Sequence, residues 1–460
     1  MSTYSELLEH IQSLRIIDTH EHLPFESKRS RDTDVLAEWL THYFSSDLVS
    51  AGLGDNELAT VRDSRKDIQG RWQMVEPYWH AAESTGYGRA LSLAARDIYG
   101  VEAINAQTIE TLNQRFQEAR AHGGHYRLVL RDKSGIAVSI RDPMPVSYQE
   151  TEDPFVFTLR TDRFICPNHY SQMRAAGAEV GLEAHTLADW MEVTRRHIEK
   201  CVNGNTRVVC LKCALAYHRS LRFDKVTQAE AERAFNELFK DCNLPDARTP
   251  IKVSQALSDW MMHFVCRVAD DNRLVYQIHT GIQEGNGNVI YDSNPTLLTN
   301  LFLEYRNARF DIFHMGYPYV MELGNLAKNF RNVCIDMCWG HIISPEAARR
   351  ALVEWLDAAP ANKISAFGGD YCFVDGVYGH QLLARQNVAA ALTQKVTDGS
   401  IGLARAKEIA AWLFVENPKR LFRLDRFLDG KTKGNDQAPN TTNEGDGTSP
   451  RLICGVAHLQ

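Results

Sequence analysis

The sequence lacks the features that mark nucleic-acid-binding and membrane-spanning proteins. Acidic side chains outnumber basic ones by 58 to 51, which gives a net charge of −7, whereas nucleic-acid-binding domains carry a basic patch or stripe. No apolar run approaches the about 18 residues of a membrane-spanning helix. The opening MSTYSELLEH shows no basic stretch followed by an apolar one, as a signal peptide would. We therefore expect a cytoplasmic protein with neither a nucleic-acid nor a membrane partner.

Cysteine is scarce as well, with 10 residues in 460, and these are scattered through apparent strands and helices. In a chain of this size, such a distribution is typical of reduced core cysteines rather than of a disulfide framework. The remaining composition, 44% hydrophobic and 24% charged, is ordinary for a globular protein with a large core.

Short apolar runs alternate with longer helical patterns along most of the chain. Near-continuous apolar runs are typical of parallel strands that are buried on both faces. Strands are expected over 14–20, 135–142, 163–169, 207–215, 274–281, 308–316, 332–340 and 363–371. Helical patterns fall at 186–201, 227–240, 252–269, 318–329, 345–358, 379–396 and 401–414. This alternation predicts an α/β fold, a (β/α)₈ TIM barrel. The alternative is an open, doubly wound sheet, which is disfavoured because no glycine-rich phosphate loop follows the first run.

One connection is much longer than the others. Residues 24–134 separate the first two predicted strands and are rich in helical pattern and aromatic side chains. An insertion there leaves the carboxyl end of the first strand, where such barrels carry their catalytic residues. We expect a helical cap over the site; the alternative is an appendage that only adds stability. Residues 1–425 would form this barrel domain, and the Gly-, Asn- and Thr-rich residues 426–460 a flexible tail.

Polar side chains stand where several of these strands end. The stretch RIIDTHEHLPFE places His20 and His22 two residues apart, on one face of a strand. Alone, the pair could be two solvated histidines or two ligands of one metal ion. Further candidates at matching strand ends are Lys212 in the fourth strand, His279 in the fifth, His314 in the sixth and Asp370 in the eighth. Because a barrel gathers these ends around one axis, the joint pattern predicts a metal site.

Zinc chemistry suits these side chains. Zinc binds neutral imidazole and carboxylate oxygen, and a catalytic site keeps a position for water. Asp370 could be both a ligand and the acceptor of the proton from the attacking water. His314 could bind a second metal or donate a hydrogen bond to the substrate. Asp18 is expected to support the histidines rather than to bind the ion.

The motifs DTHEH, IHTG, FHMG and GGDY, in this order, resemble the amidohydrolase superfamily and, within it, amidohydrolase family 2. The stretches LKCALAYHRSL and FHMGYPYVMELGNLAKNF resemble the amidohydrolase domain that is fused to glutamine synthetase-like domains, and uronate isomerases are a more distant resemblance. The family implies metal binding at His20, His22, His279 and Asp370. Lys212 could be a carboxylated lysine that bridges two metals, or could pair with a substrate carboxylate or an acidic neighbour.

We therefore expect a metal-dependent hydrolase that uses a metal-activated water to cleave an amide C–N bond or a lactone of a small, carboxylate-bearing substrate. The alternatives are a decarboxylase, a uronate isomerase-like enzyme and, least favoured, a non-catalytic barrel. The expected cofactor is Zn²⁺, as one or two ions, with Mn²⁺ or another divalent transition metal possible. A homo-oligomer is expected. Candidate substrate-binding residues at the strand ends are Arg141, Tyr217, Arg219, Trp339 and Tyr371.

Overall fold

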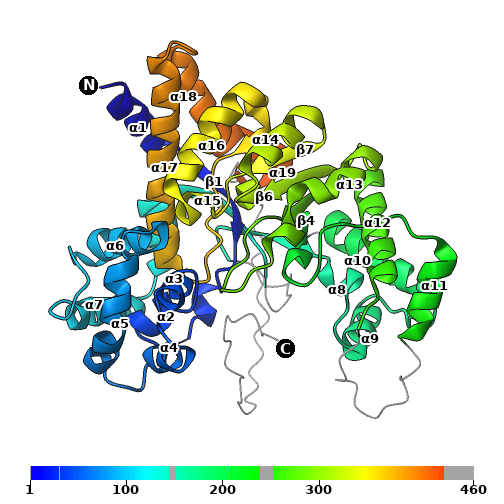
Figure 1. Ribbon diagram of the computed structural model, residues 1–460, viewed down its shortest axis with the longest axis horizontal. Coiled ribbons are helices and arrows are strands. Elements are labelled where there is room, and N and C mark those ends of the chain that lie inside the picture. Colours follow the sequence, from blue (N-terminus) through cyan, green and yellow to red (C-terminus); the bar gives the residue numbers. More distant parts are fainter. Residues whose placement is uncertain (1, 31, 144–151, 205, 239–251, 429–460) are drawn as a thin grey trace, which may run out of the picture.

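Eight strands form a single sheet in the computed structural model, which describes residues 2–30, 32–143, 152–204, 206–238 and 252–428. The strands follow one another in chain order, and all neighbours are parallel. They are β1 (Ile16–Glu21), β2 (Ile136–Arg141), β3 (Phe155–Arg160), β4 (Val208–Cys213), β5 (Val275–His279), β6 (Arg309–Phe313), β7 (Val333–Asp336) and β8 (Ile364–Ser365). Thr19 N donates to Phe367 O and Asp370 N donates to His20 O. The sheet thus closes into the predicted (β/α)₈ barrel (Figure 1).

The third strand differs from the prediction. Residues 163–169 are not a strand. The first of them belong to the short helix α8 (Asp162–Ile165), and β3 lies upstream at Phe155–Arg160. A short apolar run such as RFIC cannot be assigned to helix or strand from periodicity alone. The better strand signal is the alternation in FVFTLR, whose Phe155, Phe157 and Leu159 are fully buried.

Helices surround the barrel, and several of them begin at a side chain that caps the helix. Thr186 accepts a hydrogen bond from Asp189 N at the start of α10 (Leu187–Asn203), and Thr227 does so from Glu230 N at the start of α11 (Gln228–Glu237). Such caps satisfy amide groups that have no partner within the helix. The surrounding helices are α9 (Tyr170–Glu179), α10 (Leu187–Asn203), α11 (Gln228–Glu237), α12 (Gln255–Asp271), α13 (Thr299–Glu304), α14 (Val320–Asn329), α15 (Gly340–Ile343), α16 (Pro345–Ala358), α17 (Val374–Thr397) and α18 (Leu403–Ala411).

The two ends of the barrel differ in character. At the amino end, Leu421 and Phe422 of α19 (Asn417–Phe422) pack with Ile17, Val138 and Val156 in an apolar cluster. The carboxyl end instead holds the buried polar residues that are described below. Helix α1 (Thr3–Ser13) precedes β1, and α20 (Asp425–Leu428) is the last described helix. Most of the predicted tail, from residue 429 onward, lies outside the described residues.

The predicted helical insertion after the first strand is confirmed. It contains α2 (Val35–Trp39), α3 (Phe44–Ser50), α4 (Asp55–Val61), α5 (Ile68–Ala82), α6 (Gly86–Tyr99), α7 (Ile109–His122) and a π-helical turn at Arg127–Lys133. These helices gather on one side of the molecule, in blue and cyan in Figure 1. The ring of Tyr43 stacks on Trp339 with 4.5 Å between centroids, and the ring of His42 lies 5.9 Å from that of Tyr371. The insertion therefore reaches the carboxyl end of the barrel.

A buried polar network joins the insertion to α17. The carboxylate of Asp375 accepts hydrogen bonds from Trp39 Nε1 at 2.9 Å and from Tyr99 Oη at 2.8 Å. His125 Nε2 lies 2.7 Å from the other carboxylate oxygen. Burial alone would raise the pKa of Asp375. The contact with His125 and the other partners outweighs this effect, so the pKa lies below its usual value. An ionised carboxylate with these partners fixes the insertion against the barrel.

Two further observations concern membrane spans and cysteines, for which the sequence analysis made predictions. Among the described residues, every helix is too short or too polar to cross a membrane. The described cysteines form no disulfides with one another, and most are buried. Cys210 and Cys213 are spaced as Cys-x-x-Cys, but both lie in β4, where side chains three residues apart point to opposite faces. They are core residues, as predicted.

Candidate metal centre

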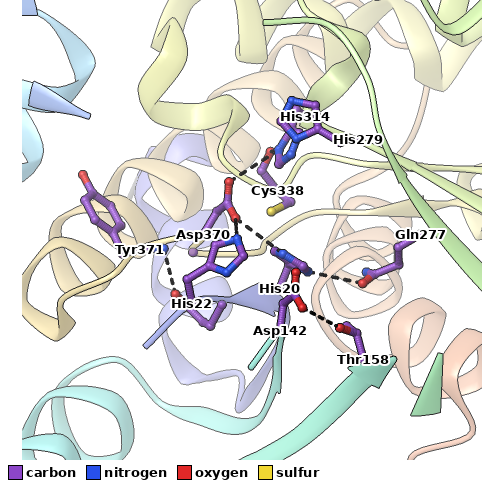
Figure 2. Close-up of polar contacts among 12 residues, drawn as sticks. His20, His22, Asp142, Thr158, Gln277, His279, His314, Cys338, Asp370 and Tyr371 are labelled. Carbon is purple, nitrogen blue, oxygen red and sulfur yellow. Dashed lines mark hydrogen bonds and ion pairs between the residues drawn. The ribbon is translucent and has the colours of Figure 1, made fainter. Parts of the chain in front are cut away.

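Two histidines and one aspartate converge at the carboxyl end of the barrel. His20 lies in β1, His22 follows that strand, and Asp370 follows β8. The Nε2 atom of His20 lies 3.6 Å from Asp370 Oδ1, and the Nε2 atom of His22 lies 3.3 Å from the same oxygen. Figure 2 shows both imidazoles directed at this carboxylate. His20 is fully buried and Asp370 is 5% exposed. One carboxylate oxygen thus faces two imidazole nitrogens.

The orientation of His20 follows from its contact with Gln277. The Gln277 amide nitrogen donates to Thr19 O at 3.1 Å and to Asp311 Oδ2 at 3.0 Å. These bonds leave Gln277 Oε1 as an acceptor, 3.3 Å from His20 Nδ1. His20 therefore carries its proton on Nδ1 and keeps a lone pair on Nε2, which is buried and has no hydrogen-bond partner. A hydrogen bond from the far ring nitrogen is the usual support of a metal-ligating histidine.

Asp370 is held in place by its backbone and by the insertion. Its φ of 58° lies in the left-handed region, which non-glycine residues rarely adopt. Its amide donates to His20 O at 2.8 Å, and the preceding Gly369 amide donates to Asp18 Oδ1 at 3.0 Å. Tyr43 Oη lies 2.6 Å from Asp370 Oδ2 and from its carbonyl oxygen. Asp18 thus supports the site through the backbone, as the sequence suggests.

The two glycines before Asp370 leave room for neighbouring side chains. A Cβ atom on Gly369 would lie 1.7 Å from Glu21 Oε1. A Cβ atom on Gly368 would lie 2.8 Å from Cys338 Sγ and 2.7 Å from Thr19 Oγ1. Side chains from β1 and from the segment after β7 can therefore pack directly against this backbone.

His314 and His279 form a second group of imidazoles beside Asp370. His314 Nδ1 lies 3.8 Å from Asp370 Oδ2 and 3.2 Å from Cys338 O. The rings of His314 and His279 are 4.2 Å apart. His279 Nε2 donates to Ile282 O at 2.9 Å, which leaves Nδ1 as the nitrogen with a lone pair.

The protonation states suit metal ligation. Burial lowers the pKa of His314 to about 3, and burial also takes the pKa values of His20 and His279 well below the usual range. Burial raises the pKa of Asp370, but the imidazoles of His314 and His22 outweigh that effect and leave it well below its usual value. Neutral imidazoles around an ionised carboxylate are the forms that bind divalent metals.

Other buried carboxyl groups surround the site. Burial raises the pKa of Asp18 to about 7 and that of Asp336 to about 6, and it raises those of Glu21 and Asp311 well above normal. Burial of so many acidic groups disfavours their ionised forms, and a bound cation would compensate for the negative charge.

The donor set fits a divalent transition metal. Among the described residues, the ligand atoms that lie within 4.8 Å of one another form two groups, His20–His22–Asp370 and His314–Cys338–Asp370. The first group contains three of the predicted ligands. His279 is in neither group, although its ring contacts His314, and its role as a ligand stays a prediction.

Lys212 lies on β4 and is 1% exposed. Its Nζ atom is 3.6 Å from the centre of the Phe313 ring. Burial lowers the pKa of its ammonium group, and the nearby carboxylate of Asp142 opposes this effect. A buried lysine with a lowered pKa is more readily the neutral amine that carboxylation requires. Whether Lys212 is carboxylated stays a prediction.

The predicted substrate residues divide into two sets. Trp339 and Tyr371 lie at the site: the Trp339 ring is 5.2 Å from His314, and Tyr371 N donates to Glu21 Oε2 at 2.8 Å. The ring of Tyr217, in the turn after β4, is 4.7 Å from that of His279. The structure thus brings all three to the carboxyl end of the barrel, and their roles in substrate binding stay predictions.

The two predicted arginines make other contacts. Arg141 Nε donates to Leu23 O, and its guanidinium lies 4.4 Å from the centre of the Phe25 ring. Arg219 Nη2 lies 2.7 Å from Asp259 Oδ1 on α12. These guanidinium groups are engaged with the protein itself, and their roles in substrate binding stay predictions.

Several site residues were not predicted. Tyr43 comes from the insertion, 327 positions from Asp370, and no local pattern marks it. Gln277 precedes His279 by two residues, so the strand period of two could have indicated it. Asp142 ends the predicted second strand; it accepts a hydrogen bond from Arg160 Nε at 3.0 Å and one from Thr158 Oγ1 at 3.2 Å. Arg160 went unnoticed because β3 was misplaced.

A closed parallel barrel with histidine, histidine and aspartate at its carboxyl end defines a barrel enzyme with a candidate metal centre. The family model described as amidohydrolase matches residues 164–424. The chain belongs to this amidohydrolase family, which confirms the resemblance seen in the sequence.

Known proteins resemble this chain at low identity. Protein fluG of Emericella nidulans is 24% identical over 227 residues, which are 47% of this chain. The match covers 26% of that protein, so the chain corresponds to only part of it. The uronate isomerase of Thermotoga maritima has a TM-score of 0.74 at 15% identity, over 91% of this chain and 97% of that one. The glucuronate isomerase of Caulobacter crescentus has a TM-score of 0.74 at 18% identity, over 92% and 94%. At these identities, the structures establish the fold alone.

Proposed function

We propose that this chain is a metal-dependent hydrolase that cleaves an amide C–N bond, or a lactone, of a small carboxylate-bearing substrate. The observation that carries the proposal is the convergence of His20 Nε2 and His22 Nε2 on one oxygen of Asp370. An unpartnered, buried Nε2 atom on His20 supports the same conclusion, because a lone pair in such a place needs a ligand.

His20, His22 and Asp370 would hold the metal, with His279 as a further predicted ligand. A bound divalent ion would act as a Lewis acid that polarises the substrate carbonyl and lowers the pKa of water. Asp370 is the carboxylate placed to accept the proton that water loses as it attacks. Its low pKa keeps it ionised at neutral pH. Tyr43 fixes the carboxylate by its hydrogen bond to Oδ2.

The surroundings favour a substrate that carries a carboxylate. Lys212 is buried near Asp370 and is the basic side chain that would pair with such a carboxylate. The stacked rings of Tyr43 and Trp339 cover the carboxyl end of the barrel and would limit the access of bulk water.

The second candidate is a uronate isomerase-like reaction. The observation that favours it is the likeness of fold to two uronate isomerases. This likeness covers more than nine-tenths of this chain and therefore includes at least part of the insertion. In that case Asp370 and Tyr43 would move protons between carbon and oxygen of a sugar acid, without uptake of water.

Product analysis separates these reactions. Amides, γ-glutamyl compounds, lactones, aromatic acids and uronates are incubated with metal-loaded protein in ¹⁸O-labelled water. A hydrolase incorporates ¹⁸O into a new carboxylate, an isomerase gives a product of unchanged mass from a uronate, and a decarboxylase releases CO₂. Turnover of uronates alone would refute the hydrolase proposal.

The role of Asp370 is tested by Asp370→Asn, which keeps the size of the side chain and removes its charge. We predict that turnover falls by about 10²- to 10⁴-fold while the protein keeps part of its metal. If Asp370 is a ligand only, lost activity instead follows lost metal and returns with excess metal. His22→Ala, measured in parallel, should lose metal while circular dichroism shows an intact fold.

A further inference from the structure

We propose that His314, Cys338 and Asp370 form a second cation site, which takes a thiophilic divalent ion such as Zn²⁺ or Co²⁺. This site lies beside the His20–His22–Asp370 group and shares Asp370 with it. The inference goes beyond the proposed function, because it concerns a metal–sulfur bond that can be observed in a protein without any known substrate.

Geometry is the first observation. One ring nitrogen of His314, the Sγ atom of Cys338 and a carboxylate oxygen of Asp370 all lie within 4.8 Å of one another, and all three residues are buried. Ligand atoms at about 2.0–2.3 Å from a common ion have separations below this limit. A single ion can therefore contact all three with small side-chain shifts.

The carboxylate of Asp370 is oriented for sharing. Its Oδ1 atom faces His20 and His22 at 3.6 and 3.3 Å, and its Oδ2 atom lies 3.8 Å from His314 Nδ1. Figure 2 shows Asp370 between the two histidine groups, with Cys338 next to it. Each oxygen thus faces a different set of donors, as a bridging carboxylate does.

His314 provides a second, independent observation. Its side chain is fully buried, and its Nε2 atom has no hydrogen-bond partner in the described part of the chain. Buried polar nitrogens are nearly always paired with protein, water or an ion. Its Nδ1 atom lies 3.2 Å from Cys338 O, which can only accept a hydrogen bond, so the ring proton is on Nδ1 and the lone pair on Nε2 is the one available for ligation.

The position of Cys338 is fixed by its neighbours. Its amide donates to Asp336 Oδ1 at 2.8 Å. Glycine at position 368 leaves the space that the thiol occupies, because a Cβ atom there would lie 2.8 Å from Sγ. The segments that follow β7 and β8 thus hold the sulfur beside Asp370.

The chemistry of the thiol sets the choice of metal. Binding replaces the thiol proton by the ion and releases that proton to solvent. Soft thiolate ligands select zinc and cobalt over magnesium or calcium, which prefer oxygen.

Cobalt substitution tests the proposal directly. Apo-protein is loaded with Co²⁺ and its near-ultraviolet spectrum is recorded for a sulfur-to-cobalt charge-transfer band. We expect the band in the wild type and its loss in Cys338→Ser, together with the loss of about one ion per chain. The matched control is Cys334→Ser, which lies in β7, four residues before Cys338, and is partly exposed; it should keep both. A wild type without the band, or a Cys338→Ser variant with an unchanged spectrum, would overturn the proposal.

Two further measurements keep the test decisive. Zinc-edge X-ray absorption of the wild type needs no variant and should show a sulfur scatterer at about 2.3 Å; a first shell of nitrogen and oxygen alone would contradict the site. The double variant His20→Ala/His22→Ala should keep the cobalt band while it loses the other ion. Loss of the band there would show that the thiolate site does not exist separately. None of these outcomes depends on hydrolytic activity.

Discussion

At the scale of single residues, the hydroxyl group of Tyr43 is the clearest contribution of the insertion to the site. It lies 2.6 Å from Asp370 Oδ2, while the ring stacks on Trp339. Hydrogen bonds to charged groups contribute about 1.5–3 kcal/mol. We expect Tyr43→Phe to keep the ring stack, the fold and the metal content, while turnover falls by about 10- to 100-fold. Steady-state kinetics with metal analysis measures both.

Tyr87→Phe is the matched control for that variant, because the Tyr87 ring also stacks on Tyr43, with 5.2 Å between centroids. Within the described residues, Tyr87 makes no hydrogen bond to Asp370. This control should turn over substrate at nearly the wild-type rate. A Tyr43→Phe variant that matches it would show that the hydroxyl does not assist Asp370.

Glu284, in the loop after β5, gives a pH-dependent prediction. Burial raises its pKa to about 7 from the usual 4.5, although Arg62 opposes the shift. Between these two values the folded protein binds more protons than the unfolded chain, so this group lowers the stability as the pH rises from 4.5 through 7. Glu284→Gln should remove that loss. Between pH 5 and pH 8, the free energy of unfolding of the variant should rise relative to that of the wild type by at most about 3 kcal/mol. Solvent that screens the group makes this difference smaller.

Denaturant unfolding of the metal-free proteins at pH 5 and pH 8 measures this difference. Glu354→Gln, on the exposed side of α16, is the control and should show the same pH dependence as the wild type. If the free-energy difference between Glu284→Gln and the wild type is the same at both pH values, Glu284 titrates at its ordinary pKa in the folded protein.

At the scale of elements, the segment after β8 determines whether the site assembles. A Cβ atom on Gly369 would meet Glu21 Oε1 at 1.7 Å and Glu21 Cδ at 2.7 Å. We expect Gly369→Ala to destabilise the fold by about 1–3 kcal/mol, as overpacking does. The same shift would displace Asp370 and weaken metal binding. Thermal unfolding and metal titration measure the two effects.

Gly402→Ala is the control, because a Cβ atom there would meet nothing within 4 Å and the residue is exposed. It should leave stability and metal affinity nearly unchanged. Equal behaviour of the two alanine variants would mean that the backbone at Gly369 can move without cost, against the account of the site given above.

The positions of the strands could be predicted from the sequence better than the residues at which they end. The apolar runs located seven strands, and the matching strand ends indicated His20, His22, Lys212, His279, His314 and Asp370. Strand bounds came out shorter than predicted: β7 ends at Asp336 and β8 at Ser365, and the remaining predicted residues form turns in which Trp339 and Asp370 adopt positive φ values. Such turns depend on tertiary contacts, which periodicity does not report.

At the scale of the whole molecule, the barrel was predictable and the insertion's role was only partly so. Alternating strands and helices imply one closed parallel sheet, and the closed sheet implies a shared site at the carboxyl ends. The contacts of Tyr43 with Asp370, and of Trp39 and Tyr99 with Asp375, join residues 276 to 336 positions apart. Pairings of that length follow from the packed fold and leave no local pattern in the sequence.

The location of the bound metal tests the central claim most directly. Crystals of zinc-loaded protein, measured on both sides of the zinc absorption edge, give an anomalous difference map. We predict a zinc peak in contact with His20 Nε2, His22 Nε2 and a carboxylate oxygen of Asp370, whether or not a second peak lies beside His314 and Cys338. A fully loaded protein whose zinc lies elsewhere, with no peak between these three side chains, would contradict the account.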